Sequence, residues 1–306
     1  MHYILNRFIL GDTREVLISS DQFSETANAH ERMQLTIASE EKFDAVARNY
    51  LDFESDMLTS SLETALVGFG QGMEQMGIRR LLNRKLSNLL SATRSYVDFI
   101  RHATKIVLPN EADSKKIAEL FSEHYDTSLA YRTLDVLRNH AQHAGFPIQS
   151  IEYTTTALHE MPGTSLKKTI APILNIEELE QNKELKKSVV SELTQRGKKV
   201  NLKCFVREYV ASMASIHEHF RELASPIFSK DALFIQELAK AFPSSTGTTE
   251  IPVPLYAASF DGAQCIKKIY LGDGLQKYGA FLAAGNAHFT RTGIYFVSGE
   301  SEKDDT

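Results

Sequence analysis

The stretch LLNRKLSNLLSATRSYVDF, residues 81–99, decides how this chain is expected to fold. Apolar side chains recur in it every three or four residues, which is typical of a helix that buries one face. The apolar stripe extends from Ile78 to Val107, and Pro109 ends it because proline cannot continue the helical hydrogen bonds. The other faces carry arginine and lysine. The stretch therefore predicts a long amphipathic helix that packs within a helical bundle.

The neighbouring segments have the same helical period. We expect an earlier helix that begins at Ser39, and two shorter helices over residues 113–124 and 127–143. Short connections between amphipathic helices favour an antiparallel bundle over residues 39–150. The glycine-rich segment at residues 68–77 is interpreted as a linker or helix break, because it lacks the Gly-Lys-Ser/Thr ending of a phosphate-binding loop.

The N-terminal part of the chain is expected to contain strands. Residues 1–38 are predicted to form a short β-rich segment, with apolar strands near residues 3–10 and 16–18. In MQLTI, residues 33–37, apolar and polar residues alternate as they do in a half-buried strand. A third strand is therefore predicted there.

The C-terminal region, residues 151–306, is expected to mix both kinds of structure. The pattern predicts a strand near residues 148–158, helices within 176–196 and 203–240, and short strands or loops after them. The acidic end, residues 299–306, is expected to be disordered. The predicted fold is mainly α, a helical bundle with small β-containing elements at its N- and C-terminal ends, and α+β overall.

The composition limits the class of protein. The chain has 306 residues, 42% of them hydrophobic, and a formal net charge of −5, so any site for a polyanion must be a local patch. Its two cysteines, Cys204 and Cys265, have no metal-ligand spacing and form no disulfide framework. No apolar stretch reaches the roughly 20 residues that span a bilayer. We expect a cytoplasmic protein with no membrane contact.

The segment LRNHAQHAGFP, residues 137–147, concentrates polar chemistry at a helix end. Arg138, Asn139 and His143 all lie on the wide polar side of the predicted helix. Since His143 is in the last turn, the negative end of the helix stabilises its protonated form. Lysine, arginine and histidine are also common at helix ends because they complement this dipole, so a purely structural role stays open.

The same residue types suit metal-free cleavage of RNA. The reaction needs a base for the 2′-hydroxyl proton, an acid for the departing 5′-oxygen and a cation for the charge on the phosphoryl oxygens. Histidine can serve the first two needs, and the planar guanidinium of arginine serves the third. One helix offers one such histidine and one such arginine, whereas two copies across a two-fold axis would offer the full set.

Arg138-Asn139-x-x-x-His143 resembles the R-(N/H/D)-x-x-x-H form of the motif of HEPN-domain ribonucleases. The helical context over about residues 40–150 and the preceding helix, residues 81–99, are also similar to that family. The resemblance implies that Arg138 binds or polarises the scissile phosphate. It also implies that His143 is the general acid or base and that Asn139 orients the phosphate or the histidine.

The resemblance further implies a homodimer whose cleft holds both motifs and needs no metal or cofactor. Its substrate would be single-stranded RNA, tRNA or mRNA, cleaved to 2′,3′-cyclic phosphate and 5′-hydroxyl ends. Such proteins are commonly toxins or antiviral-defence effectors, here with a separate antitoxin or regulatory protein. The alternative is a non-catalytic HEPN-like interaction or ligand-sensing module.

Three further features allow two interpretations each. The lysine-rich segment at residues 183–203 suits an RNA-tracking patch or a solvated helix and turn. His140 could assist with RNA or lie on a solvated helix surface. The two histidines of HEH, residues 217–219, point about 200° apart on a helix, so we reject a shared metal ion there.

Overall fold

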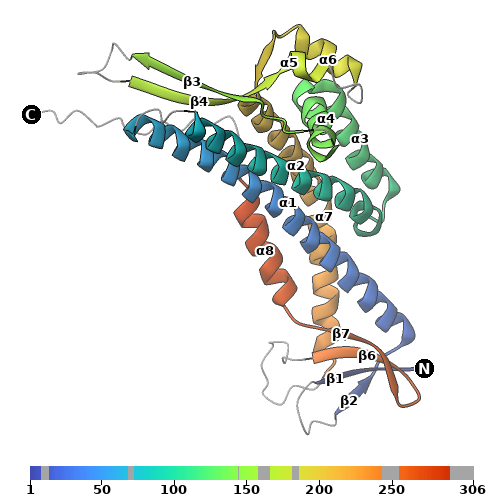
Figure 1. The fold of residues 1–306 in the computed structure, drawn as a ribbon. Helices are drawn as coiled ribbons and strands as arrows, with labels where there is room; N and C mark the ends of the chain where they lie inside the picture. The colour runs from blue at the N-terminus through green and yellow to red at the C-terminus, as the bar shows by residue number, and fades with distance from the viewer. Residues whose placement is uncertain are drawn as a thin grey trace, which may run out of the picture. The chain divides into compact units, whose positions relative to one another are not determined.

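Most of the described chain is helical, as expected for a mainly α protein (Figure 1). The computed structural model describes residues 1–7, 14–67, 72–143, 145–157, 166–180, 186–242 and 255–289. Of residues 67, 142, 143, 157, 166, 167 and 180 it describes the backbone alone. The helices within these ranges are α1 (Ser20–Val67), α2 (Met73–Val107), α3 (Glu111–Thr127), α4 (Leu129–His143), α5 (Ile176–Glu180), α6 (Lys187–Thr194), α7 (Leu202–Lys240) and α8 (Gly274–Asn286).

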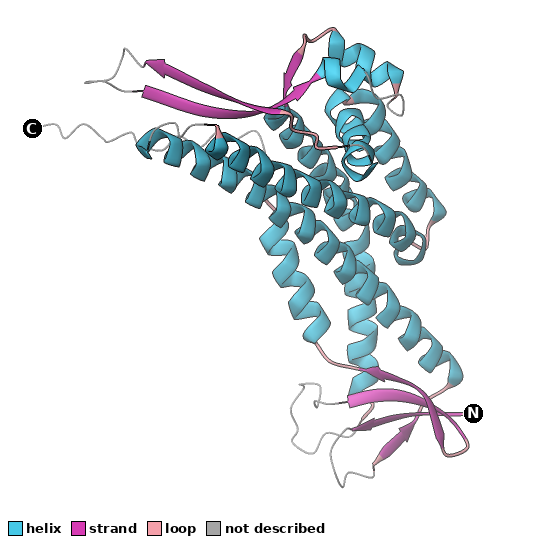
Figure 2. Ribbon diagram, in the orientation of Figure 1, coloured by secondary structure: helices cyan, strands magenta, loops and turns pink. Residues whose placement is uncertain are grey.

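The described strands form two antiparallel sheets, drawn in magenta in Figure 2. Their bounds are β1 (His2–Arg7), β2 (Glu15–Leu17), β3 (Ser150–Ala157), β4 (Leu166–Asn175), β5 (Lys199–Asn201), β6 (Leu255–Asp261) and β7 (Gln264–Tyr270). One sheet has the order β2-β1-β6-β7, and the other has the order β3-β4-β5. The first sheet therefore joins the two ends of the described chain through the pairing of β1 with β6.

The chain divides into two compact units, each built from segments that are far apart in the sequence. The first unit contains Met1–Arg48, Ser91–Glu123 and Ile216–Ala287. The second unit is formed mainly of Asn49–Leu90 and His124–Ser215. Residues of the bundle predicted over 39–150 contribute to both units.

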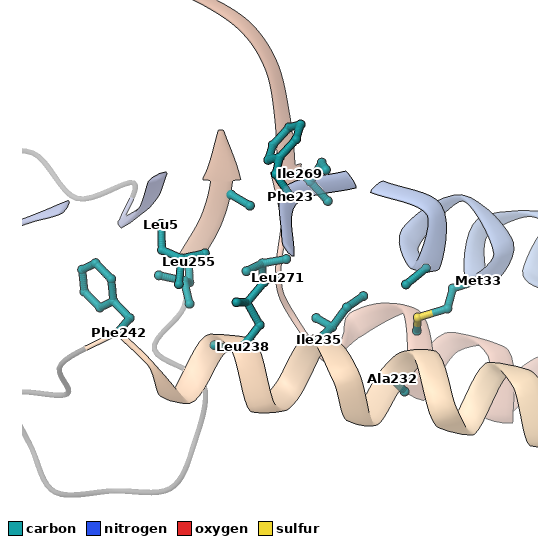
Figure 3. Close-up of a cluster of buried hydrophobic side chains, with 13 residues drawn as sticks. Leu5, Phe23, Met33, Ala232, Ile235, Leu238, Phe242, Leu255, Ile269 and Leu271 are labelled. Carbon is teal, nitrogen blue, oxygen red and sulfur yellow. The ribbon is translucent and has the colours of Figure 1, made fainter. Parts of the chain in front are cut away.

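The core of the first unit lies where the four-stranded sheet meets the start of α1 and the end of α7. Figure 3 shows apolar side chains from all three packed together, among them Leu5 of β1, Met33 of α1 and Leu238 of α7. Leu5 is fully buried and Met33 nearly so. Burial of one such side chain contributes roughly 1.5–3 kcal/mol, so this cluster holds the sheet against the helices.

The strand predicted at residues 33–37 is wrong, because α1 begins at Ser20 and passes through this segment without a break. The helix start is a capping box: the amide of Gln22 donates to Oγ of Ser19 at 3.0 Å, and the amide of Ser19 donates to Oε1 of Gln22 at 2.8 Å. Buried residues then follow at helical spacing, with Met33 and Ile37 four apart. The helical period along the whole of α1 outweighs the short local alternation.

The structure confirms some of the other predicted helices and strands and differs from the prediction elsewhere. The helices predicted over 113–124 and 127–143 and the strand near 148–158 are confirmed by α3, α4 and β3. Of the linker or break predicted at 68–77, residues 68–71 lie outside the described residues, and residues 73–77 belong to α2, which begins at Met73. Helix α8 was not expected, and the predicted acidic tail at 299–306 lies outside the described residues.

Candidate functional site

The motif helix, α4, starts from a side-chain cap. Oγ of Ser128 accepts a hydrogen bond from the amide of Tyr131 at 3.0 Å, as an N-terminal cap does. The same hydroxyl donates to Oε1 of Glu208 in α7 at 2.5 Å. Ala130, Leu134 and Leu137 are buried, whereas Asn139 is exposed and Arg138 is half-buried.

The structure brings two of the three predicted site residues together. Nη2 of Arg138 donates to Oδ1 of Asn139 at 2.6 Å, although the two residues are consecutive on the helix. Nε of Arg138 is buried and has no hydrogen-bond partner among the described residues. Since the buried Nε–H is out of reach and one N–H of Nη2 meets Asn139, the remaining N–H groups of Nη1 and Nη2 are the donors left for a ligand.

His143 is the last residue of α4. Its backbone is therefore at the C-terminal end of the helix, as predicted, while its side chain lies outside the described part of the chain. The geometry between His143 and Arg138 stays a prediction.

The segment after the motif is attached to α2. Asn83 Nδ2 donates to the carbonyl of Ile148 at 2.8 Å, and the amide of Ile148 donates back to Oδ1 of Asn83 at 2.9 Å. Arg79 Nη1 donates to the carbonyl of Gln149 at 3.0 Å. These contacts place the chain that leaves the motif helix beside a cationic part of α2, which also contains Arg80 and Arg84. The sequence analysis missed Asn83, although a polar residue within a leucine-rich stripe is a visible signal.

His140 does not lie on a fully solvated helix surface. It is half-buried, and burial lowers its pKa below the ordinary value. The amide of Gly145 donates to the carbonyl of His140 at 3.1 Å, which closes the end of the motif helix. A neutral His140 is therefore a part of this helix end at physiological pH.

The lysine-rich segment at 183–203 is partly neutralised within the described residues. Lys198 lies 2.8 Å from Oε1 of Glu177, and Lys199 lies 2.8 Å from Oε1 of Glu152. Both pairs are on the surface, where such contacts contribute little to stability. Their charge is available to a polyanion only if these pairs open, which weakens the RNA-tracking interpretation.

A second polar centre lies in the first unit, and the sequence analysis did not find it. We call Glu40, Tyr96, His217 and Arg221 the buried polar cluster. Arg221 donates two hydrogen bonds to the carboxylate of Glu40, from Nε to Oε1 at 2.7 Å and from Nη2 to Oε2 at 2.9 Å. His217 Nε2 lies 3.0 Å from Oε2 of Glu40, and its Nδ1 lies 3.2 Å from the hydroxyl of Tyr96. A neutral imidazole protonated on Nε2 fits both contacts.

The electrostatics of the cluster keep its net charge at zero. Burial lowers the pKa of His217 below its ordinary value and outweighs the opposing effect of Glu40, so the imidazole is neutral. Burial by itself raises the pKa of Glu40, but the hydrogen bonds from Arg221 and His217 lower it to about 2. One carboxylate and one guanidinium therefore balance each other. This pairing explains how a carboxylate that is 5% exposed remains charged.

The described residues contain neither a metal-binding group of side chains nor a helix that could span a membrane. Within the ranges that the structure describes, no three His, Cys, Asp or Glu side chains are grouped so that they could hold a metal ion. His217 of the rejected HEH segment belongs to the buried polar cluster. None of the described helices combines the length and the apolar character needed to cross a bilayer.

Comparisons with known proteins assign no family to this chain. No family model matches it, and no curated protein or solved structure matches it either. The residues and their geometry are therefore the basis on which a function can be proposed.

Proposed function

We propose that this protein is a metal-independent endoribonuclease of the HEPN type. The observation that carries the proposal is the pair of Arg138 and Asn139, hydrogen-bonded side by side in the helix whose last residue is His143. A guanidinium held in place next to a helix end suits the recognition of a phosphate, because the planar fork is oriented before the ligand arrives.

The proposed reaction uses the 2′-hydroxyl of the RNA as the nucleophile. Its oxygen attacks the adjacent phosphorus while a base removes the proton, and the bond from phosphorus to the 5′-oxygen breaks. The departing 5′-oxygen takes a proton from an acid, so the products are a 2′,3′-cyclic phosphate and a 5′-hydroxyl. Arg138 stabilises the charge that develops on the phosphoryl oxygens, and His143 transfers the protons.

The proposed active unit is a homodimer in which two copies of the motif supply the acid, the base and the cations. The substrate is single-stranded RNA, including tRNA or mRNA, and Arg79, Arg80 and Arg84 of α2 provide charge for its backbone beside the segment that follows the motif. A cytoplasmic toxin or antiviral-defence effector, controlled by a separate antitoxin or regulatory protein, is the setting that fits this activity.

The test is cleavage of total RNA by the purified protein in the presence of EDTA. We expect cleavage by the parent protein, and a loss of about 100-fold or more for Arg138→Ala and His143→Ala. Arg138→Lys keeps the charge but loses the fork, so it should remain strongly impaired.

The matched controls are His140→Ala, which removes the neighbouring imidazole, and Arg48→Ala, which removes an exposed arginine of the first unit. Both should cleave RNA like the parent. Equal rates for the parent and both motif variants would mean that the motif only completes a helix, as in a non-catalytic interaction module.

A further inference from the structure

A cavity of about 230 Å³ opens between α1, α7 and α8 in the first unit. Its wall is mainly apolar, with Ile37 from α1 and Phe220 and Phe228 from α7. Helix α8 contributes Gln276 and three small residues, the consecutive Gly279 and Ala280 and, one turn later, Ala283. Nothing in the proposed ribonuclease chemistry uses this space.

The small residues of α8 keep the cavity open. A Cβ added to Gly279 would lie 3.4 Å from Cγ1 of Ile37 and 3.6 Å from Cζ of Phe228, so even one methyl group at this position would contact both walls. Larger side chains at Ala280 or Ala283 would occupy the volume between the helices. The cavity therefore depends on the residue sizes along one face of α8.

The polar lining of the cavity includes Thr36, Ser225 and Gln276 together with two residues of the buried polar cluster. Glu40 and Arg221 both line it, and both oxygens of Glu40 are occupied by Nε and Nη2 of Arg221. These two hydrogen bonds use only part of the five N–H donors of Arg221, and its side chain is 26% exposed, so a ligand can reach the others. The cavity thus offers hydrogen-bond donors in an apolar wall, a combination that is common in small-molecule sites.

The charge balance selects the kind of ligand. Arg221 is already matched by Glu40, so an anionic ligand would bring an unbalanced charge into a half-enclosed apolar space. A neutral acceptor, such as a carbonyl oxygen, avoids this cost and still accepts a hydrogen bond from Arg221. An apolar cavity of about 150 Å³ holds benzene, which has six non-hydrogen atoms. At the same volume per atom, the present cavity holds roughly nine non-hydrogen atoms.

We propose that this cavity binds a small neutral molecule with an apolar body and a single hydrogen-bond acceptor that meets Arg221. The site is independent of the motif helix and adds a ligand-binding function to the first unit. Its occupant is of the size of an aromatic ketone rather than of a nucleotide.

Three probes of similar size test the proposal by calorimetry and thermal shift with the full chain. Acetophenone has the acceptor, ethylbenzene lacks it, and benzoate replaces it with a charge. We expect acetophenone to bind and to raise the melting temperature, and ethylbenzene and benzoate to bind about tenfold more weakly or worse.

The variant Ala283→Leu fills the cavity, and Ala284→Leu adds the same side chain at the exposed neighbouring position. Acetophenone should bind Ala284→Leu like the parent and Ala283→Leu at least tenfold more weakly, with both variants folded by circular dichroism. The proposal is overturned by failure of all three probes to bind, by tighter binding of benzoate or by equal binding to both variants. It is also overturned if ethylbenzene equals acetophenone.

Discussion

Asn83 of α2 binds the segment that follows the motif helix, and its side-chain amide is both a hydrogen-bond donor and an acceptor there. It donates to the carbonyl of Ile148 and accepts from the amide of the same residue. Asn83 itself is only 1% exposed. Because Ile148 is fully buried, its backbone amide and carbonyl depend on the side-chain amide of Asn83 for their hydrogen bonds. The position of the chain after α4 therefore depends on one side chain of α2.

We predict that Asn83→Ala lowers the free energy of unfolding by about 1–3 kcal/mol, since it leaves a buried donor and a buried acceptor without partners. Urea denaturation measures this change. Asn88→Ala, at an exposed position of the same helix, is the control and should change the free energy by less than about 0.5 kcal/mol. Equal effects of the two substitutions would show that the amide of Asn83 does not hold this segment.

The buried polar cluster predicts how stability depends on pH. Because burial lowers the pKa of His217 in the folded protein, the unfolded chain binds more protons once the pH falls below about 6.5. Stability is therefore lost as the pH falls below about 6.5, by at most about 1.4 kcal/mol per pH unit for this group. The depressed pKa of Glu40 extends the loss below about pH 4.5, in the same direction.

Urea denaturation at several pH values checks this dependence. His217→Gln should be less stable than the parent at neutral pH but should lose less stability between about pH 7 and about pH 5. His102→Gln, at an exposed position of α2, is the control and should keep the slope of the parent. A slope unchanged by His217→Gln would contradict the assignment of a neutral, buried imidazole.

At the scale of elements, α1 shows how far local patterns can be trusted. The capping residues Ser19 and Gln22 were visible in the sequence, but the alternation in residues 33–37 favoured a strand. Helix α8 was missed for a different reason. Gly274, Gly279 and Gly285 lower its intrinsic helix propensity, and packing against α1 and α7 stabilises it instead.

The start of α1 can be tested directly. Ser19→Ala removes the acceptor for the amide of Gln22 and should cost about 0.5–2 kcal/mol of unfolding free energy. Ser24→Ala, at an exposed position inside the helix, should be neutral or slightly stabilising because alanine has the higher helix propensity. The same loss for both variants, measured by urea denaturation, would contradict the cap.

At the scale of the whole molecule, residues distant in sequence meet in ways that no local pattern contains. Glu40 and His217 are separated by most of the chain, yet they share a hydrogen-bonded cluster. Strands β1 and β6 pair although they lie at opposite ends of the described chain. The mainly α class and the motif helix could be predicted from periodicity and end signals, whereas the two units, the cluster and the cavity follow from tertiary packing.

The most direct measurement of the central claim, RNA cleavage by the 2′-hydroxyl route, uses one oligonucleotide sequence in two forms. The purified protein in EDTA is incubated with a single-stranded RNA that it cleaves and with the same sequence carrying 2′-O-methyl groups. We predict fragments with 2′,3′-cyclic phosphate and 5′-hydroxyl ends from the first and no fragments from the second. Equal cleavage of both forms, or no cleavage of any RNA by the parent protein, would contradict the proposed function.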